Sequence, residues 1–142
     1  MDLQELADRE EIRAVVTRYT RLVDSDALTE GTYDASTVFT DDATLDYSSA
    51  GGPVDSPATT LAWVREMRQA FVRWQHVIGQ VDIEVDGDTA RATAYLVNPM
   101  VVAGPDGSEA VIEVGGYYHH QLVRTRDGWR SRHMVDELVW TH

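Results

Sequence analysis

The stretch from Leu3 to Asp24, LQELADREEIRAVVTRYTRLVD, decides how the rest of the chain is read. Its apolar residues recur at steps of three and four, which predicts a helix with one buried face. Asp2 stands at the N-cap position and Glu5 follows three residues later, as in a capping box. Tyr19 and Asp24 stand at the end of the apolar face, and both can point inward if the last turn loosens. The alternative is a packed tyrosine and an ordinary turn residue.

The composition indicates a small globular chain. Its 142 residues, 43% of them hydrophobic, suit one domain spanning 1–142. No apolar run is long enough to cross a membrane, and the acidic N-terminus does not resemble a signal peptide. The absence of cysteine rules out disulfides and thiolate sites and is compatible with the cytoplasm. The net charge of −12 repels phosphate backbones and anionic lipids, so we expect a small-molecule partner and neither nucleic acid nor membrane.

After residue 76 the sequence pattern changes from helical to strand-like. An apolar stripe from Leu61 to Trp74 predicts a second helix, capped by Thr59 or Thr60. A short strand is expected before it, at Ala43 to Tyr47. Four long strands follow, separated by glycine-containing turns: His76–Val85, Thr89–Val102, Glu109–Arg126 and Trp129–Trp140. Helices that precede an antiparallel meander indicate the α+β class.

Strands of ten or more residues must curl when they pair in a sheet. We expect bulges or bends at Gly79, Gly115 and Gly116, where a missing side chain lets the strand turn. A curled sheet covered by the first helix encloses a conical cavity. Such a cavity suits a small apolar ligand.

His76 is the histidine of most interest, because it joins the second helix to the first long strand. Strict alternation places it on the polar face with Gln80 and Asp82. A bulge near Gly79 would instead bring it inward with Val81, and the pattern leaves both placements open. No histidines are spaced to present two imidazoles on one face, so no metal site is expected.

Several short segments, taken in order, connect this chain to a known family. They are RYTRLVD at the end of the first helix, FTDDATLDY, the helix that leads to His76, the hairpin VDGDTARATAYL, GGYY and RDGWR. Their order and spacing resemble the SnoaL-like branch of the nuclear transport factor 2-like superfamily over essentially the whole chain. Scytalone dehydratase, bile-acid 7α-dehydratase and hexachlorocyclohexane dehydrochlorinase are members. The resemblance implies an α+β barrel, in which N-terminal helices cover a cone-shaped, curved antiparallel sheet.

The resemblance also implies roles for three residues. His76 would be the general base that removes a proton from carbon, and Asp24 would orient it and stabilise the imidazolium. Tyr19 matches a tyrosine of the bile-acid enzyme, and its phenol would assist a leaving hydroxyl or a developing oxyanion. The dehydrochlorinase has a lysine at this position, so dehydration is favoured over loss of halide. Elimination of this kind requires no cofactor.

The side chains that contact the substrate are less well defined by the sequence. One set belongs to the helices and the first strand and would form a wall, with plain core packing as the alternative for its helical members: Tyr47, Trp63, Met67 and Phe71. A second set belongs to the later strands and would complete the polar site: Asn98, Tyr118, His120 and Arg132, with His133 as the alternative to Arg132. Alternation places Tyr118 and His120 on one face and Tyr117 and His119 on the other, without showing which face is concave.

The leading hypothesis is therefore a cofactor-independent lyase of the dehydratase type, acting on a small hydrophobic cyclic, polyketide-like or steroid-like substrate. An isomerase or polyketide cyclase with the same base is the second reading. A non-catalytic ligand-binding or dimerisation module is the third, because fold does not fix function. We expect a homodimer, with a trimer as the alternative. An approach of Asp24 and His76 to within about 3 Å at a closed apolar cavity would favour the enzyme.

Overall fold

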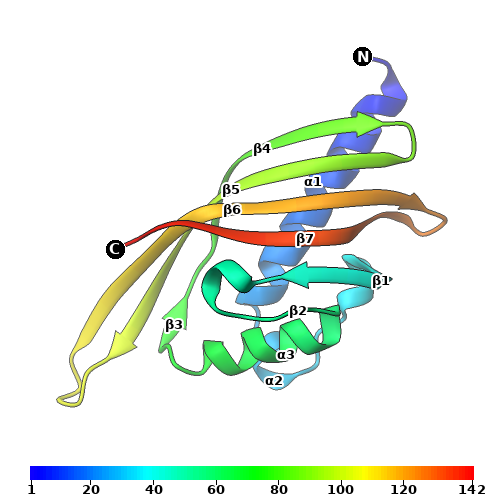
Figure 1. The fold of residues 1–142 in the computed structure, drawn as a ribbon. Helices are drawn as coiled ribbons and strands as arrows, with labels where there is room; N and C mark the ends of the chain where they lie inside the picture. Colours follow the sequence, from blue (N-terminus) through cyan, green and yellow to red (C-terminus); the bar gives the residue numbers. More distant parts are fainter.

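The computed structural model describes all 142 residues, Met1–His142 (Figure 1). Helices dominate the first half and strands the second, which confirms the α+β class. The helices are α1 (Leu3–Asp24), α2 (Asp26–Glu30) and α3 (Pro57–Arg68), with short 3-10 turns η1 (Ala35–Thr37) and η2 (Ser48–Ala50). The strands are β1 (Phe39–Asp46), β2 (Val54–Asp55), β3 (Arg73–Trp74), β4 (Val77–Asp86), β5 (Thr89–Ala103), β6 (Glu109–Thr125) and β7 (Gly128–Thr141). None of the helices combines the length and the hydropathy needed to cross a membrane.

All seven strands belong to one sheet, in the order β2-β1-β7-β6-β5-β3, with β4 also paired to β5. The predicted antiparallel meander from β4 to β7 is confirmed. The pairing of β1 with β7 is parallel, so the sheet is not antiparallel throughout as expected. The reason is the long excursion between these two strands, because a parallel neighbour requires a crossover and cannot be reached by a hairpin.

The sheet curls at the glycine positions where bends were expected. The pairing of β4 with β5 shifts register between Ile78 and Val81, around Gly79, and that of β6 with β7 shifts at Gly115 and Gly116. A Cβ on Gly116 would overlap the carbonyl oxygen of Glu137, so only glycine fits there. Figure 1 shows β5 and β6 bending away from the rest of the sheet beyond this region. The bend opens a hollow between the sheet and α3.

Helix α1 lies across one face of the sheet and forms its cover (Figure 1). Asp2 caps it by accepting a hydrogen bond from the backbone N–H of Glu5 at 2.8 Å, as predicted. Its buried face consists of Ile12, Val15, Val16, Tyr19 and Val23, together with Asp8 and Thr20. Leu3 and Leu6 belong to the predicted stripe but are exposed, because the first turns extend past β4.

Asp8 links the first half of α1 to the sheet, at the end where β6 turns into β7. Its carboxylate accepts two hydrogen bonds from the guanidinium of Arg124, at 2.7 and 2.8 Å, and one from the indole of Trp129 at 3.1 Å. The pKa of Asp8 is well below its usual range, and the hydrogen bonds from Arg124 are the largest cause. Trp129 is fully buried below this contact.

Helix α3 differs from its predicted extent at both ends. Ser56, rather than Thr59 or Thr60, is its N-cap and accepts from the N–H of Thr59 at 3.2 Å. The helix ends at Arg68, whereas the apolar stripe suggested an end near Trp74. The stripe continues because the chain beyond Arg68 still packs on the core, with Trp74 buried in β3 opposite Met100.

Candidate active site

The end of α1 and the start of β4 meet through Asp24 and His76. The Nδ1 atom of His76 lies 2.6 Å from Oδ1 of Asp24, and the backbone N–H of His76 donates to Oδ2 at 2.9 Å. One carboxylate therefore fixes both the ring and the main chain of the histidine. The side chains are 8% (His76) and 23% (Asp24) exposed. The two side chains therefore lie within hydrogen-bond distance of each other.

His76 points inward because of the bulge around Gly79. Ile78 pairs with Leu96 while Val81 pairs with Ala94, so β4 carries one extra residue in this interval. Even-numbered residues before the bulge therefore share the concave face with odd-numbered residues after it. Of the two placements that strict alternation left open for His76, the structure therefore shows the inward one.

The surroundings of His76 fix the orientation of its ring. Because Nδ1 faces the carboxylate of Asp24, we assign its proton there, which leaves Nε2 as the lone-pair nitrogen. The imidazole stacks against Tyr118 at a centroid distance of 6.1 Å and meets the edge of Trp74 at 5.4 Å. Trp74 is itself held by its indole N–H, which donates to the carbonyl of Val23 at 3.0 Å. The dyad is thus framed by packed aromatic rings.

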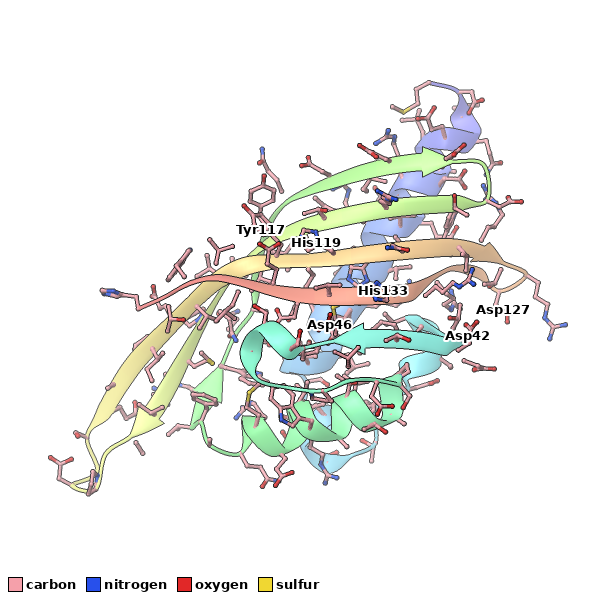
Figure 2. All side chains as sticks on the ribbon, in the orientation of Figure 1. Asp42, Asp46, Tyr117, His119, Asp127 and His133 are labelled. Atoms are coloured by element: carbon pink, nitrogen blue, oxygen red, sulfur yellow. The ribbon has the colours of Figure 1, made fainter.

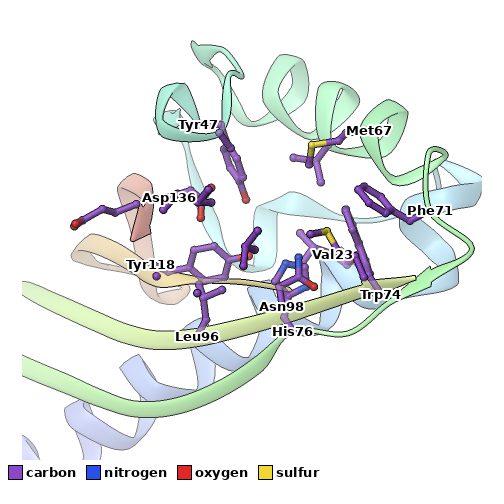
Figure 3. Close-up of a pocket in the computed structure, with 18 residues that line it drawn as sticks. Val23, Tyr47, Met67, Phe71, Trp74, His76, Leu96, Asn98, Tyr118 and Asp136 are labelled. Carbon is purple, nitrogen blue, oxygen red and sulfur yellow. The ribbon is translucent and has the colours of Figure 1, made fainter. Parts of the chain in front are cut away.

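His76 lines a cavity of about 200 Å³ between α3 and the bent sheet (Figure 3). Its wall is mostly apolar and includes Val23, Val64, Met67, Phe71, Trp74, Leu96, Met100 and Leu138. Polar groups enter it at five main positions: Tyr47, His76, Asn98, Tyr118 and Asp136. An apolar hollow with a few convergent polar groups is the usual form of a small-molecule site.

The structure brings most of the predicted contact residues to this cavity. Tyr47, Met67, Phe71, Asn98 and Tyr118 line it. The side-chain oxygen of Asn98 is buried, points to no protein partner and belongs to a residue in cross-strand register with His76. Asn98 therefore leaves a hydrogen-bond acceptor unpaired in the cavity wall near His76.

Three of the predicted contact residues do not line the cavity. Trp63 packs on Tyr47, with ring centroids 5.7 Å apart. His120 is buried behind the cavity and hydrogen-bonds Ser131 at 2.8 Å, and burial lowers its pKa to about 3. Arg132 is exposed in a polar groove on the opposite face of the sheet.

His133 shares that outer groove with Arg132, although alternation had placed the two on opposite faces. A second register shift, where Gln121 pairs with His133 and Leu122 with Ser131, inserts the extra residue that alters the phase. Figure 2 shows His133 on the same outward face as Tyr117 and His119.

Tyr19 reaches the cavity only through another tyrosine. It is fully buried, does not line the cavity, and hydrogen-bonds the phenol of Tyr47. Burial raises the pKa of Tyr19, Tyr47 and Tyr118 well above the ordinary value of 10, and neighbouring negative charges add to the effect. Tyr47 and Tyr118 therefore present neutral phenols to the cavity, with Tyr19 supporting Tyr47 from behind.

Asp136 is a polar cavity residue that was not predicted from the sequence, and the adjacent Glu137 is another. Asp136 lies in β7, directly opposite Tyr118 in β6, and is 8% exposed. Burial, and next the nearby charge of Asp46, raise its pKa to about 7. A signal was available, because Asp136 alternates with Met134 and Leu138 on one face of the last strand.

Comparison with known proteins places this architecture among established relatives. Residues 4–135 match the model of the SnoaL-like domain family. An uncharacterized protein of Mycobacterium tuberculosis (strain H37Rv) is 33% identical over 136 residues, which cover 96% of this chain and 88% of the relative. The crystal structure of the Kfla4162 protein from Kribbella flavida superposes with a TM-score of 0.82 at 26% identity, covering 97% of this chain and 95% of that one. Hexachlorocyclohexane dehydrochlorinase LinA-type3 from Novosphingobium barchaimii shares the fold, with a TM-score of 0.78 at 17% identity over 100% of this chain and 93% of that one.

Proposed function

The chain belongs to the SnoaL-like domain family, and from that premise we propose that it is a cofactor-independent lyase of the dehydratase type. The observation that carries the proposal is the 2.6 Å contact between His76 and Asp24 at the wall of an apolar cavity. A base held by a half-buried carboxylate beside an apolar pocket is suited to removing a proton from carbon.

The reaction is a β-elimination. Nε2 of His76 takes a proton from the substrate carbon, and Asp24 stabilises the imidazolium that forms. The electron pair of the broken C–H bond forms the C=C bond, and the oxygen on the next carbon leaves with a proton as water. Side chains alone supply the base and the proton donor, so the reaction needs no cofactor.

The size of the cavity narrows the substrate class. A cavity of about 200 Å³ is somewhat larger than the ~150 Å³ hollow that holds a benzene molecule in an engineered protein core. We infer a single-ring, mostly apolar substrate that carries a carbonyl and a β-hydroxyl group. A four-ring steroid would have to extend out of the cavity.

Loss of hydroxide is favoured over loss of halide. The chain contains no lysine, and none of its arginines lines the cavity, so no cation is placed to receive a halide ion. The cavity instead offers the O–H groups of Tyr47 and Tyr118, which can donate to a leaving oxygen.

A β-hydroxy ketone with one ring tests the proposal. We expect 3-hydroxycyclohexanone in D₂O to incorporate deuterium next to its carbonyl and to yield cyclohexenone, both followed by NMR. Deuterium incorporation without enone would assign the same base to an isomerase. If neither occurs while the ketone binds, as judged by protein NMR shifts, the lyase proposal is wrong.

Variants then identify the base. His76→Ala and Asp24→Asn should each reduce deuterium incorporation by about 10²–10⁴-fold, the usual contribution of a positioned general base and its support. Tyr19→Phe should have a smaller effect, because Tyr19 acts through Tyr47. Asp82→Asn, on the exposed face of β4, is a control with the same change of charge.

A further inference from the structure

The carboxyl group of Asp136 has no partner in the protein. Unlike Asp24, which accepts two hydrogen bonds, it is held by neither a hydrogen bond nor an ion pair, and only burial and the charge of Asp46 act on it. It nevertheless lines the cavity (Figure 3). A buried polar group without a partner is costly, and a catalytic role is one of the reasons for which proteins keep such a group.

The placement of Asp136 complements that of His76. Tyr118 lies between them, since His76 stacks on the Tyr118 ring and Asp136 is the cross-strand neighbour of Tyr118 in β7. His76 and Asp136 therefore line the same cavity on either side of Tyr118, where one bound substrate can contact both.

We propose that Asp136 is the general acid of this site, donating the proton with which the substrate's β-oxygen leaves as water. This inference rests on the lyase function proposed above and assigns the second half of that reaction. His76 gains a proton from carbon, Asp136 loses its proton to the departing hydroxyl, and the products are the alkene and water. The imidazolium then returns one proton to the Asp136 carboxylate through solvent, which restores both groups.

The tyrosines are less suited to this role than Asp136. An acid donates most effectively when its pKa lies near the working pH, and burial moves all three phenols far above that range. The ionisable groups that face Asp136 or the same cavity come from every element around it: Tyr19 on α1, Asp46 on β1, Tyr47 between β1 and η2, His76 before β4, Tyr118 on β6 and Glu137 on β7. No lysine or arginine faces it, so nothing stabilises its ionised form.

Binding of cyclohexanone tests whether Asp136 carries a proton that it can donate, without requiring catalysis: the one oxygen of this ketone can only accept a hydrogen bond, and it can take the place of the leaving β-oxygen. We expect the Kd of the wild-type protein, measured by NMR titration between pH 5.5 and 8.5, to rise above pH 7 by up to about tenfold per pH unit as Asp136 ionises. Asp136→Asn keeps an N–H donor and should bind with a flat profile. Asp136→Val should bind weakly at every pH, and the control Asp82→Asn should follow the wild type.

Two binding outcomes would overturn the proposal. One is a flat profile in the wild type. The other is a pH dependence that persists in Asp136→Asn and disappears in His76→Ala, which would show that the histidine is the titrating group.

Catalysis provides the second readout. In Asp136→Asn we expect deuterium incorporation next to the carbonyl of cyclohexanone to continue, while elimination from 3-hydroxycyclohexanone falls by about 10²-fold or more. Equal loss of both reactions would reject Asp136 as the acid. If the wild type shows neither reaction, the lyase function fails, and the binding profile still decides whether Asp136 is the donor.

Discussion

Replacing Asp136 by asparagine should stabilise the protein above pH 7. Burial raises the pKa of this carboxyl group from an ordinary 3.8 to about 7, so the folded state binds a proton that the unfolded state has released. At about 1.4 kcal/mol per pH unit, the penalty for ionising Asp136 reaches about 4 kcal/mol above pH 7. It is absent below pH 4, where both states are protonated. Asparagine mimics the neutral acid and avoids the penalty at every pH.

His120 has the opposite effect on stability over much of the same range. Its pKa falls from 6.5 to about 3 on burial, so the unfolded state gains a proton below pH 6.5 that the folded state does not accept. Stability due to His120 is therefore lost as the pH falls from 6.5 towards 3, while stability due to Asp136 is regained. Between about pH 4 and 6.5 the two slopes nearly cancel, and the wild-type protein should show little pH dependence there.

Urea unfolding of wild type and Asp136→Asn between pH 4.5 and 8 measures these slopes. The gain in unfolding free energy of the variant should grow by about 1.4 kcal/mol per pH unit up to pH 7 and then level off. The variant should also lose stability as the pH falls below 6.5. In the wild type the gain from protonating Asp136 offsets the loss due to His120, and in the variant this gain is absent. Parallel curves for the two proteins would refute the reasoning, since they would mean that Asp136 ionises normally in the folded state. Asp82→Asn should run parallel to the wild type.

Two further predictions concern residues that hold α1 and the bent sheet in place around the site. Asp8→Asn should destabilise the protein by about 2–4 kcal/mol at pH 7 in urea unfolding, somewhat below the cost of breaking a fully buried pair because Arg124 is 32% exposed; the loss should shrink below about pH 4, because Asp8 of the unfolded wild type then binds a proton that the folded ion pair still excludes. Gly116→Ala should cost about 1–3 kcal/mol or more, because its Cβ would overlap backbone atoms, whereas Gly79→Ala, whose nearest neighbour would be 3.7 Å away, should be tolerated in the same assay.

Local patterns predicted much of the fold. The helical period of Leu3–Asp24 and the glycine turns between the long strands were sufficient for the helix and the meander, because both depend on nearby residues. Gly79 also predicted the bulge that turns His76 inward. The partnership of Asp24 and His76 came from resemblance, since no local pattern joins residues that are 52 positions apart.

The predictions from the sequence were wrong where tertiary packing overrides local periodicity. The apolar stripe up to Trp74 continued past the end of α3, because a turn and a strand bury the same kinds of side chain as a helix. Arg132 was placed near the cavity because the register shift opposite Gln121 and Leu122 carries no glycine to mark it. Asp136 was missed because a lone acidic residue in a strand is usually exposed, and only the sheet geometry shows which face it occupies.

The cavity contains one imidazole supported by a carboxylate and one unsupported carboxyl group, and in the proposed reaction this difference distinguishes the base from the acid. Asp24 accepts hydrogen bonds from the ring and backbone of His76, which favour its negative charge, and that charge stabilises the imidazolium. Asp136 accepts none and lies near Asp46, so the cavity favours its neutral form. Most acidic residues of this chain, whose net charge is −12, lie in solvent, and an aspartate there would not lower the stability of the fold. Burying it lowers stability at neutral pH, and a cost of this kind is expected where a site requires a proton donor. The acid and the base are therefore distinguished by their hydrogen-bond partners, and a donor introduced next to Asp136 should impair elimination while leaving proton abstraction by His76 intact.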